Sequence, residues 1–241
     1  MADLGEFKLE GLKLAVDTTM NVLRNPDDVQ PELKIAATLH SFFNRMRRNG
    51  SPTAIRHFVE ATESYTRAIT QEMIHKHAGH IQTFEEYRKY RPDTSAVKIA
   101  LATLEYAHGI DIPDEVLHNP IISELTLAGN EILTWANDIY SFRLALQDAV
   151  NYVNQLIEQR VQDYLATRAK LPSFGAHLDG EVARYVKGVE YSIQACIEWS
   201  LMTTRYFGTD AETVKETGVV NVVLNSEVKL GELAHGGHES E

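Results

Sequence analysis

Residues 130–141 decide the fold, and they read Asn130-Glu131-Ile132-Leu133-Thr134-Trp135-Ala136-Asn137-Asp138-Ile139-Tyr140-Ser141. Residues three and four apart share one face of a helix, so this stretch places four polar side chains in a single row: Asn130, Thr134, Asn137 and Ser141. The opposite face continues an apolar pattern that starts upstream, at Ile121, Leu125, Ala128, Ile132, Ala136 and Ile139. The stretch therefore predicts a long, largely buried helix.

The polar row consists of amides and hydroxyls without Lys or Glu, which is unusual for a face exposed to water. Buried groups of this kind need hydrogen-bonding partners. Neighbouring helices and backbone carbonyls are the ordinary partners, and an ion or a polyanionic ligand is the alternative. The spacing alone favours the ordinary partners and leaves the alternative open.

Length and composition indicate one domain, residues 1–241, with a polar C-terminal tail from about residue 219. A chain of 241 residues with 44% hydrophobic residues is long enough for one sizeable core and short for two. The net charge of −11 and the lack of a basic run argue against nucleic-acid binding. A single cysteine, Cys196, excludes a disulfide framework within the chain. The sequence has no apolar run of membrane-spanning length and no signal peptide, so we expect a cytoplasmic protein without stable membrane insertion.

Helical periodicity and capping signals divide the whole chain into helices, and no strand pattern competes with them. We expect Pro31 to begin the second helix, Ser51-Pro52 the third, and Thr83 a short helix that Arg91-Pro92 ends. Asp93-Thr94 would then cap the next helix. A last long helix is expected from about Gly180, with Gly208 as its C-cap.

The pattern from Pro120 to Leu165 is too long for one straight helix. Such a helix would measure roughly 70 Å, whereas a compact domain of this size has a radius of gyration of about 18 Å. Residues 141–148 contain no Gly or Pro, the usual causes of a sharp bend. We nevertheless expect a break in this region.

The segment from Trp135 to Ser141 resembles the start of the second metal-binding motif of class I terpene cyclases, the fungal sesquiterpene synthases in particular. The family pattern is Asn-Asp, two residues, Ser, three residues and Glu, and its Asn, Ser and Glu hold one magnesium ion. Asn137 and Ser141 match, whereas Ala145 stands at the third position. Further landmarks spread the resemblance over most of the chain: Leu23 to Pro26, Gly109 to Val116, Leu171 to Ser173 and Trp199 to Gly208.

The resemblance implies a single α-helical bundle that ionises and cyclises farnesyl diphosphate to a sesquiterpene with the help of Mg²⁺. It implies metal ligation by Asn137 and Ser141, and diphosphate binding by Arg205 and Tyr206. The family also has an arginine that senses diphosphate in an Arg-Arg-Asp-Thr-like stretch. The matching stretch here is Arg91-Pro92-Asp93-Thr94, in which Pro92 replaces the second arginine, so the resemblance implies diphosphate binding by Arg91 as a partial stand-in. It assigns no catalytic residue, and it is compatible with a homodimer. For Arg205, compensation of a helix dipole is the alternative role.

Two departures from the family bear on activity. Met1 to Leu23 contains no match to the family's Asp-rich motif, and Ala145 supplies no ligand oxygen. Mg²⁺ usually relies on carboxylates. The likeness also stops at Ser141-Phe142 and resumes at Leu146 to Ala149, so we infer that an intervening segment is absent.

Three hypotheses follow: a terpene cyclase with an incomplete metal site, a catalytically silent helical domain that binds a partner or an isoprenoid diphosphate, and an unrelated helical scaffold. The aromatic residues at helical spacing are interpreted as ordinary core, although they could line a cation pocket: Phe58, Tyr65, Trp135 and Trp199.

Overall fold

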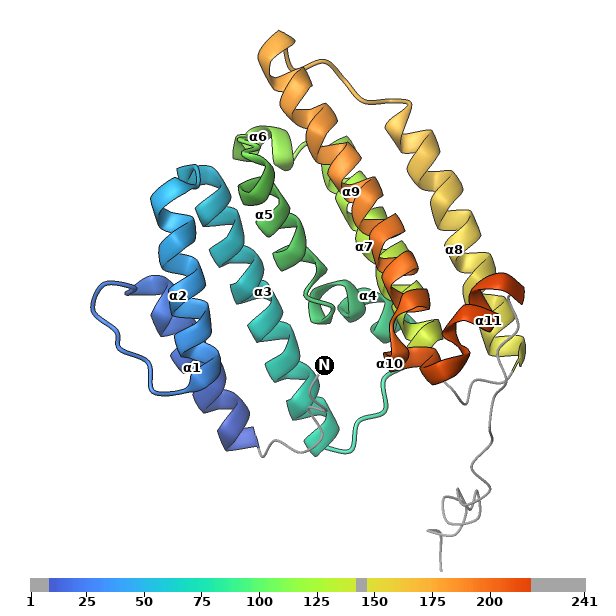
Figure 1. Ribbon diagram of the computed structural model, residues 1–241, viewed down its shortest axis with the longest axis horizontal. Coiled ribbons are helices and arrows are strands. Elements are labelled where there is room, and N and C mark those ends of the chain that lie inside the picture. Colours follow the sequence, from blue (N-terminus) through green and yellow to red (C-terminus); the bar gives the residue numbers. More distant parts are fainter. Residues whose placement is uncertain (1–8, 142–146, 218–241) are drawn as a thin grey trace, which may run out of the picture.

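The computed structural model describes residues 9–141 and 147–217, and these residues form helices and no strand. The helices lie side by side, from α1 and α2 at one side of the molecule to α8 at the other (Figure 1). The all-α prediction is confirmed. In chain order the elements are α1 (Leu9–Arg24), α2 (Lys34–Asn49), α3 (Pro52–His77), α4 (Phe84–Thr94), α5 (Val97–His108), α6 (Asp114–Leu117), α7 (Pro120–Ser141), α8 (Gln147–Arg168), α9 (Ala176–Met202), α10 (Thr204–Phe207), the 3-10 helix η2 (Gly208–Asp210) and α11 (Ala211–Thr217).

Local capping chemistry explains several of these boundaries. Ser51 caps α3 by accepting a hydrogen bond from the backbone N–H of Ala54 at 3.1 Å, and Thr83 and Glu86 form the predicted capping box of α4. The predicted start of the second helix at Pro31 is wrong by three residues, because α2 begins at Lys34. The predicted tail from about residue 219 lies outside the described residues.

The predicted end of the fourth helix at Arg91-Pro92 is also wrong. Helix α4 passes through Pro92 and continues to Thr94, and the chain turns at Ser95 and Ala96 rather than at Asp93. Proline lacks an N–H and usually ends a helix. Pro92 lies in the last turn of α4, and its carbonyl accepts a hydrogen bond from the side chain of Asn130 on α7. The Arg91-Pro92 pattern therefore does not mark the end of this helix.

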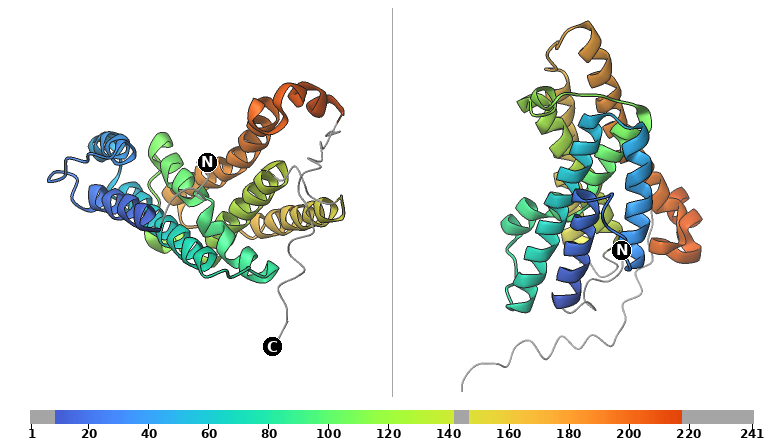
Figure 2. Two further views of the ribbon diagram at one scale, coloured as in Figure 1. Left: turned by 90° about the horizontal axis from the view of Figure 1, so that it is seen from below. Right: turned by 90° about the vertical axis from the view of Figure 1, so that its left-hand side faces the viewer.

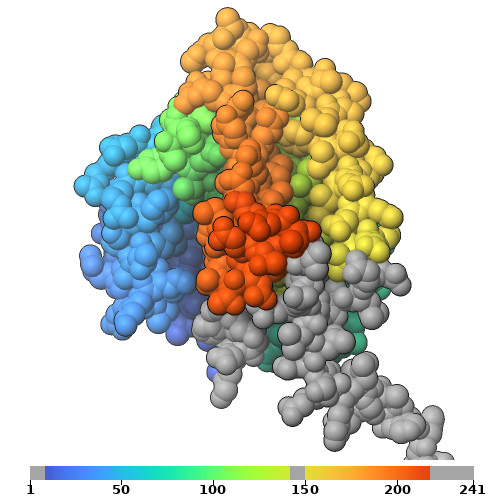
Figure 3. Space-filling model, turned by 45° about the vertical axis from the view of Figure 1, so that its right-hand side comes forward, coloured from blue at the N-terminus to red at the C-terminus, as the bar shows by residue number. Residues whose placement is uncertain are grey.

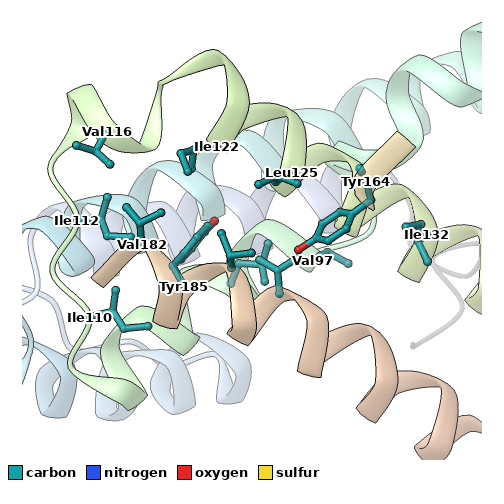
Figure 4. Packing of buried hydrophobic residues seen from close by; sticks show 14 residues of the cluster. Val97, Ile110, Ile112, Val116, Ile122, Leu125, Ile132, Tyr164, Val182 and Tyr185 are labelled. Atoms are coloured by element: carbon teal, nitrogen blue, oxygen red, sulfur yellow. The ribbon is translucent and has the colours of Figure 1, made fainter. Parts of the chain in front are cut away.

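Helix α7 lies in the main hydrophobic core and packs against α8 and α9. Its buried residues include Ile122 and Leu125, which face α9 (Figure 4). Tyr185 of α9 points toward α7, where its hydroxyl lies 3.2 Å from Oγ1 of Thr126 (Figure 4). Of the apolar face predicted for this helix, Leu125, Ala128, Ile132 and Ala136 are buried, whereas Ile121 and Ile139 are half-buried.

The expected break of the long helical pattern is confirmed, because α7 ends at Ser141 and α8 begins at Gln147. The two helices pack side by side instead of forming a rod (Figure 1). Arg160 of α8 joins them, with Nε 2.6 Å from Oε2 of Glu131 and Nη1 2.6 Å from Oε1 of Glu124. None of the described helices is both long and apolar enough to cross a lipid bilayer.

The chain after α9 turns back toward the bundle. Helix α9 is followed at once by α10, η2 and α11, which gather at one end of α9 (Figure 3). A view from that end shows α10 and α11 on the side of the molecule opposite α1 and α2 (Figure 2). The end of α7, α4 and α10 therefore lie at the same end of the bundle (Figure 1).

A buried polar cluster joins α3, α5 and α6. His57 is 6% exposed, its Nδ1 lies 2.8 Å from Oε2 of Glu105, and its Nε2 lies 2.9 Å from Oδ1 of Asp114. Arg56 pairs with the same Asp114 oxygen at 2.6 Å. Burial alone would lower the pKa of His57, but the bonds to the two carboxylates outweigh it and raise the pKa. The imidazole therefore favours its charged form.

We expect the free energy of unfolding to fall as the pH rises through the folded-state pKa of His57. The stabilisation from a group with a raised pKa is complete below its unfolded pKa of about 6.5 and is lost above its folded pKa. Urea unfolding between pH 6 and pH 9 measures this slope, and His57→Gln should flatten it. Equal slopes in the two proteins would contradict the assignment.

Candidate active site

Two of the residues predicted from the metal motif lie in the last turns of α7. Asn137 is half-buried, and its Nδ2 donates a hydrogen bond to Oη of Tyr206 at 2.8 Å. Ser141 is exposed, and its Oγ donates to the backbone carbonyl of Asn137 at 2.8 Å. The structure thus brings together Asn137, Ser141 and Tyr206, although Tyr206 is 69 residues away from Asn137 in sequence.

Arg91 binds to the same end of α7 by pairing with Asp138, a residue that was not predicted to belong to the site. The Arg91 guanidinium forms a bidentate pair with this carboxylate, with Nη2 2.6 Å from Oδ1 and Nε 2.9 Å from Oδ2. The Tyr87 hydroxyl donates to Oδ2 as well. The two charged side chains are only 14% and 17% exposed, so water screens the pair weakly.

The Arg91–Asp138 pair sets the protonation states of Arg91 and Tyr87. Burial alone would lower the pKa of Arg91, but the hydrogen bonds to Asp138 outweigh it and raise the pKa. Burial and the Asp138 carboxylate also raise the pKa of Tyr87. Arg91 therefore stays charged and Tyr87 stays protonated over the physiological range.

Arg205 is exposed on α10, next to Tyr206. Its Cζ lies 5.5 Å from the centroid of the Tyr206 ring, which is a cation–π distance. Helix α9 ends at Met202, and Thr203 caps α10 by accepting from the Arg205 N–H at 3.3 Å. Arg205 therefore lies three residues beyond the end of α9, in the last turn of α10.

Tyr206 packs against three other aromatic residues, and we call the four the aromatic cluster: Tyr140, Trp199, Tyr206 and Phe207. The Tyr206 ring lies 6.0 Å from Trp199 and 6.2 Å from Tyr140, and Tyr140 lies 5.8 Å from Phe207. Trp199 is 51% exposed. Of the aromatics considered from the sequence, Trp135 and Phe58 are buried in the core, and Trp199 alone belongs to this cluster.

Asp138 and Tyr87 are the site residues that sequence reasoning missed. Asp138 directly follows Asn137 in the motif, and Tyr87 precedes Arg91 by one helical turn, so both carried a local signal. The sequence contains no local signal that Asp138 would pair with Arg91, 47 residues away, and with Tyr87, 51 residues away.

The donor set at this end of α7 can bind a cation through two neutral oxygens. Because Asn137 turns its NH₂ group toward Tyr206, its Oδ1 is the atom that can ligate, with Oγ of Ser141 as the second donor. Ala145 lies outside the described residues, and the described part of the chain contains no group of three or more His, Cys, Asp or Glu side chains placed to hold a metal. Mg²⁺ prefers six oxygens. The set therefore fits an ion whose other ligands are phosphate oxygens and water, and does not fit a resident ion held by protein alone.

A family model matches more than half of the chain. It is the model of the terpene synthase family 2 C-terminal metal-binding domain, and it covers residues 3–144. The match ends three residues beyond Ser141, where the sequence likeness to the second metal motif also stops.

Characterised relatives extend the similarity through the C-terminal helices. Sesquiterpene synthase Agr1 of Cyclocybe aegerita is 32% identical over 90% of this chain and 69% of its own length. Sesquiterpene synthase 3 of Postia placenta is 35% identical, and this chain spans 63% of that relative's length. The alignment with Agr1 has 238 positions, but it includes only 90% of the 241 residues of this chain, which is about 217 residues. About 20 positions of Agr1 therefore align with gaps in this chain. This difference supports the inference of an absent segment.

Solved structures show the same fold. An α-eudesmol synthase superimposes with a TM-score of 0.74 at 15% identity, over 81% of this chain and 71% of that one. The SVS_A2 protein from ancestral sequence reconstruction gives a TM-score of 0.74 at 22% identity, over 83% of this chain and 64% of that one. The chain belongs to the terpene synthase family, with the all-α fold of the class I enzymes.

Proposed function

We propose that this chain is a single terpene cyclase-like domain that ionises and cyclises farnesyl diphosphate with the help of Mg²⁺. The observation that carries the proposal is the convergence of Asn137, Ser141, Tyr206 and Arg91 at one end of α7, with Arg205 beside them. The fifteen-carbon substrate is proposed because the relatives are named sesquiterpene synthases.

Each site residue then has a role. Oδ1 of Asn137 and Oγ of Ser141 would hold a Mg²⁺ ion together with diphosphate oxygens, and the ion would supply positive charge that stabilises the departing diphosphate. The guanidinium groups of Arg91 and Arg205 donate hydrogen bonds to diphosphate oxygens. Tyr206 accepts from Asn137 and so holds its amide in the ligating orientation.

The aromatic cluster provides the environment for the hydrocarbon part of the substrate. Faces of Trp and Tyr stabilise positive charge, and an apolar surface keeps water away from a carbocation. Trp199 is the member with the most exposed surface for such contact.

A second function, binding of an isoprenoid diphosphate without turnover, is favoured by the charges at the site. Both proposed metal ligands are neutral, and the nearest carboxylate, Asp138, is already engaged by Arg91 and Tyr87. Ala145 supplies no oxygen. Weak metal binding would slow ionisation more than it weakens binding.

Incubation with farnesyl diphosphate and excess Mg²⁺ tests both functions, with released diphosphate and hydrocarbon products as readouts. We expect products from the wild-type chain and a loss of about 100-fold or more in the Asn137→Ala/Ser141→Ala variant, because the metal ligands are removed. Ser123→Ala, at the opposite end of α7, is the matched control.

The outcomes separate the two functions. Saturable binding of farnesyl diphosphate without diphosphate release would replace the first function by the second. A folded protein that neither binds nor converts the substrate would contradict both.

A further inference from the structure

The turn between α4 and α5 has an unusual backbone. Ala96 has φ 61° and ψ 7°, and it is the one non-glycine residue with positive φ in the described ranges. A side chain with a Cβ rarely adopts this conformation. Such a turn persists when the surrounding structure holds it in place.

A side chain of α7 supplies that support. In a continuing helix the Pro92 carbonyl would accept from the N–H of residue 96. Here Nδ2 of Asn130 donates to this carbonyl at 2.9 Å, and Oγ of Ser95 lies 3.0 Å from it. Asn130 thus replaces a helical hydrogen bond that the turn removes.

Both polar atoms of the Asn130 amide have hydrogen-bond partners. Its Oδ1 accepts from Oγ1 of Thr134 at 2.9 Å and lies 3.1 Å from Oγ of Ser95. The single Ser95 proton serves either this oxygen or the Pro92 carbonyl at one time. Asn130 is 1% exposed and Thr134 is 2% exposed, so water does not compete. The carbonyl at Pro92 also fixes the amide orientation, because it requires a donor.

The contact lies next to the arginine of the candidate site. Arg91 directly precedes Pro92, and its partner Asp138 lies two turns beyond Asn130 on α7, about 12 Å along the helix axis. Helix α7 therefore holds the last turn of α4 at two points, through Asn130 and through Asp138.

We propose that Asn130 is a positioning residue: by holding the Pro92 carbonyl it fixes the α4–α5 turn against α7 and aims the Arg91 guanidinium at the diphosphate-binding end of α7. The proposal rests on the proposed function for the identity of the ligand that Arg91 meets, but not for the orientation of Arg91 itself.

Two substitutions that nearly preserve side-chain shape test the Asn130–Pro92 bond separately from the Thr134–Asn130 bond. Asn130→Leu removes the donor to Pro92, whereas Thr134→Val removes a neighbouring hydroxyl of the same network and leaves that donor in place. The Nε–H signal of Arg91 in an NMR spectrum, assigned by its loss in Arg91→Lys, reports the bond to Asp138 without any ligand. We expect this signal to shift and to exchange with water about tenfold faster in Asn130→Leu, and to stay unchanged in Thr134→Val.

Affinity for inorganic diphosphate with Mg²⁺, measured by calorimetry, tests the consequence. Asn130→Leu should weaken binding about tenfold in the wild-type chain and less than about twofold in an Arg91→Ala background, where no guanidinium remains to be positioned. Equal losses in both backgrounds, or an unchanged Arg91 signal and affinity, would overturn the proposal.

The two readouts also distinguish this proposal from the proposed function. If the wild-type chain binds no diphosphate, the proposed function fails, and the Arg91 signal still decides the role of Asn130. If Asn130→Leu does not fold, Asn130→Ser keeps a hydroxyl near Thr134 but is too short to reach Pro92. An unchanged Arg91 signal in folded Asn130→Ser would equally overturn the proposal.

Discussion

Arg91→Ala should lower the affinity for diphosphate by about 100-fold and the free energy of unfolding by about 3 kcal/mol. The affinity falls because the site loses its most buried cation. The stability falls because Asp138, 17% exposed, keeps its charge but loses a bidentate partner. Removing one member of a buried ion pair costs more than the pair contributes, since the remaining charge is left unsolvated. Calorimetry with magnesium diphosphate and urea unfolding measure the two effects.

A second substitution separates the effect of Arg91→Ala on diphosphate affinity from its effect on stability. Adding Asp138→Asn to Arg91→Ala removes the unpaired charge, so stability should recover by about 1–3 kcal/mol while diphosphate binding stays weak. Arg24→Ala is the matched control: Arg24 pairs with Glu63 at the surface, where the side chains are 56% and 47% exposed, so its loss should cost less than about 1 kcal/mol. Recovery of binding in the double variant would show that Arg91 does not contact the diphosphate.

The sequence predicted those parts of the fold that depend on local pattern. The apolar face of α7, the capping box at Thr83 and Glu86, and the break after Ser141 each follow from spacing or chain length within one segment. The end of α4 did not follow: the helix runs past Pro92 to Thr94, and the donor to the Pro92 carbonyl is Asn130, 38 residues further along. The Arg91-Pro92 pattern contains no information about a donor so far away in the sequence.

The polar row of α7 shows the same limit at the candidate site. Its four members are all small polar residues in the sequence, but they differ in how deeply their side chains are buried in the structure. Asn130 and Thr134 are buried and take ordinary structural roles: Asn130 bonds the Pro92 carbonyl of α4, and Thr134 bonds Asn130. Asn137 is half-buried and Ser141 is exposed at the C-terminal end of α7. Whether a polar residue of α7 has a structural or a ligand-binding role therefore depends on whether its turn of the helix packs against α4 or lies near α10. Helical periodicity alone does not predict which neighbour each turn has.

Arg160→Ala is expected to lower the free energy of unfolding by about 3 kcal/mol and to loosen α8. The guanidinium of Arg160 is 14% exposed and bridges two carboxylates that lie seven residues apart on α7. Glu124 is 41% exposed and can return to water, but Glu131 is 11% exposed and would keep an unpaired charge in the core. The loss should therefore come mainly from Glu131.

Urea unfolding measures the loss, and backbone hydrogen exchange should show faster exchange in α8 than in α3. Arg168→Ala, on the same helix, is the matched control, because Arg168 and its partner Glu190 are 47% and 27% exposed. Adding Glu131→Gln to Arg160→Ala should recover part of the stability, since a neutral amide costs less to bury than a charge. A loss equal to that of Arg168→Ala, or no recovery with Glu131→Gln, would contradict the bridge. Because α8 begins six residues after Ser141, this bridge also ties α8 to the helix that carries the proposed metal ligands.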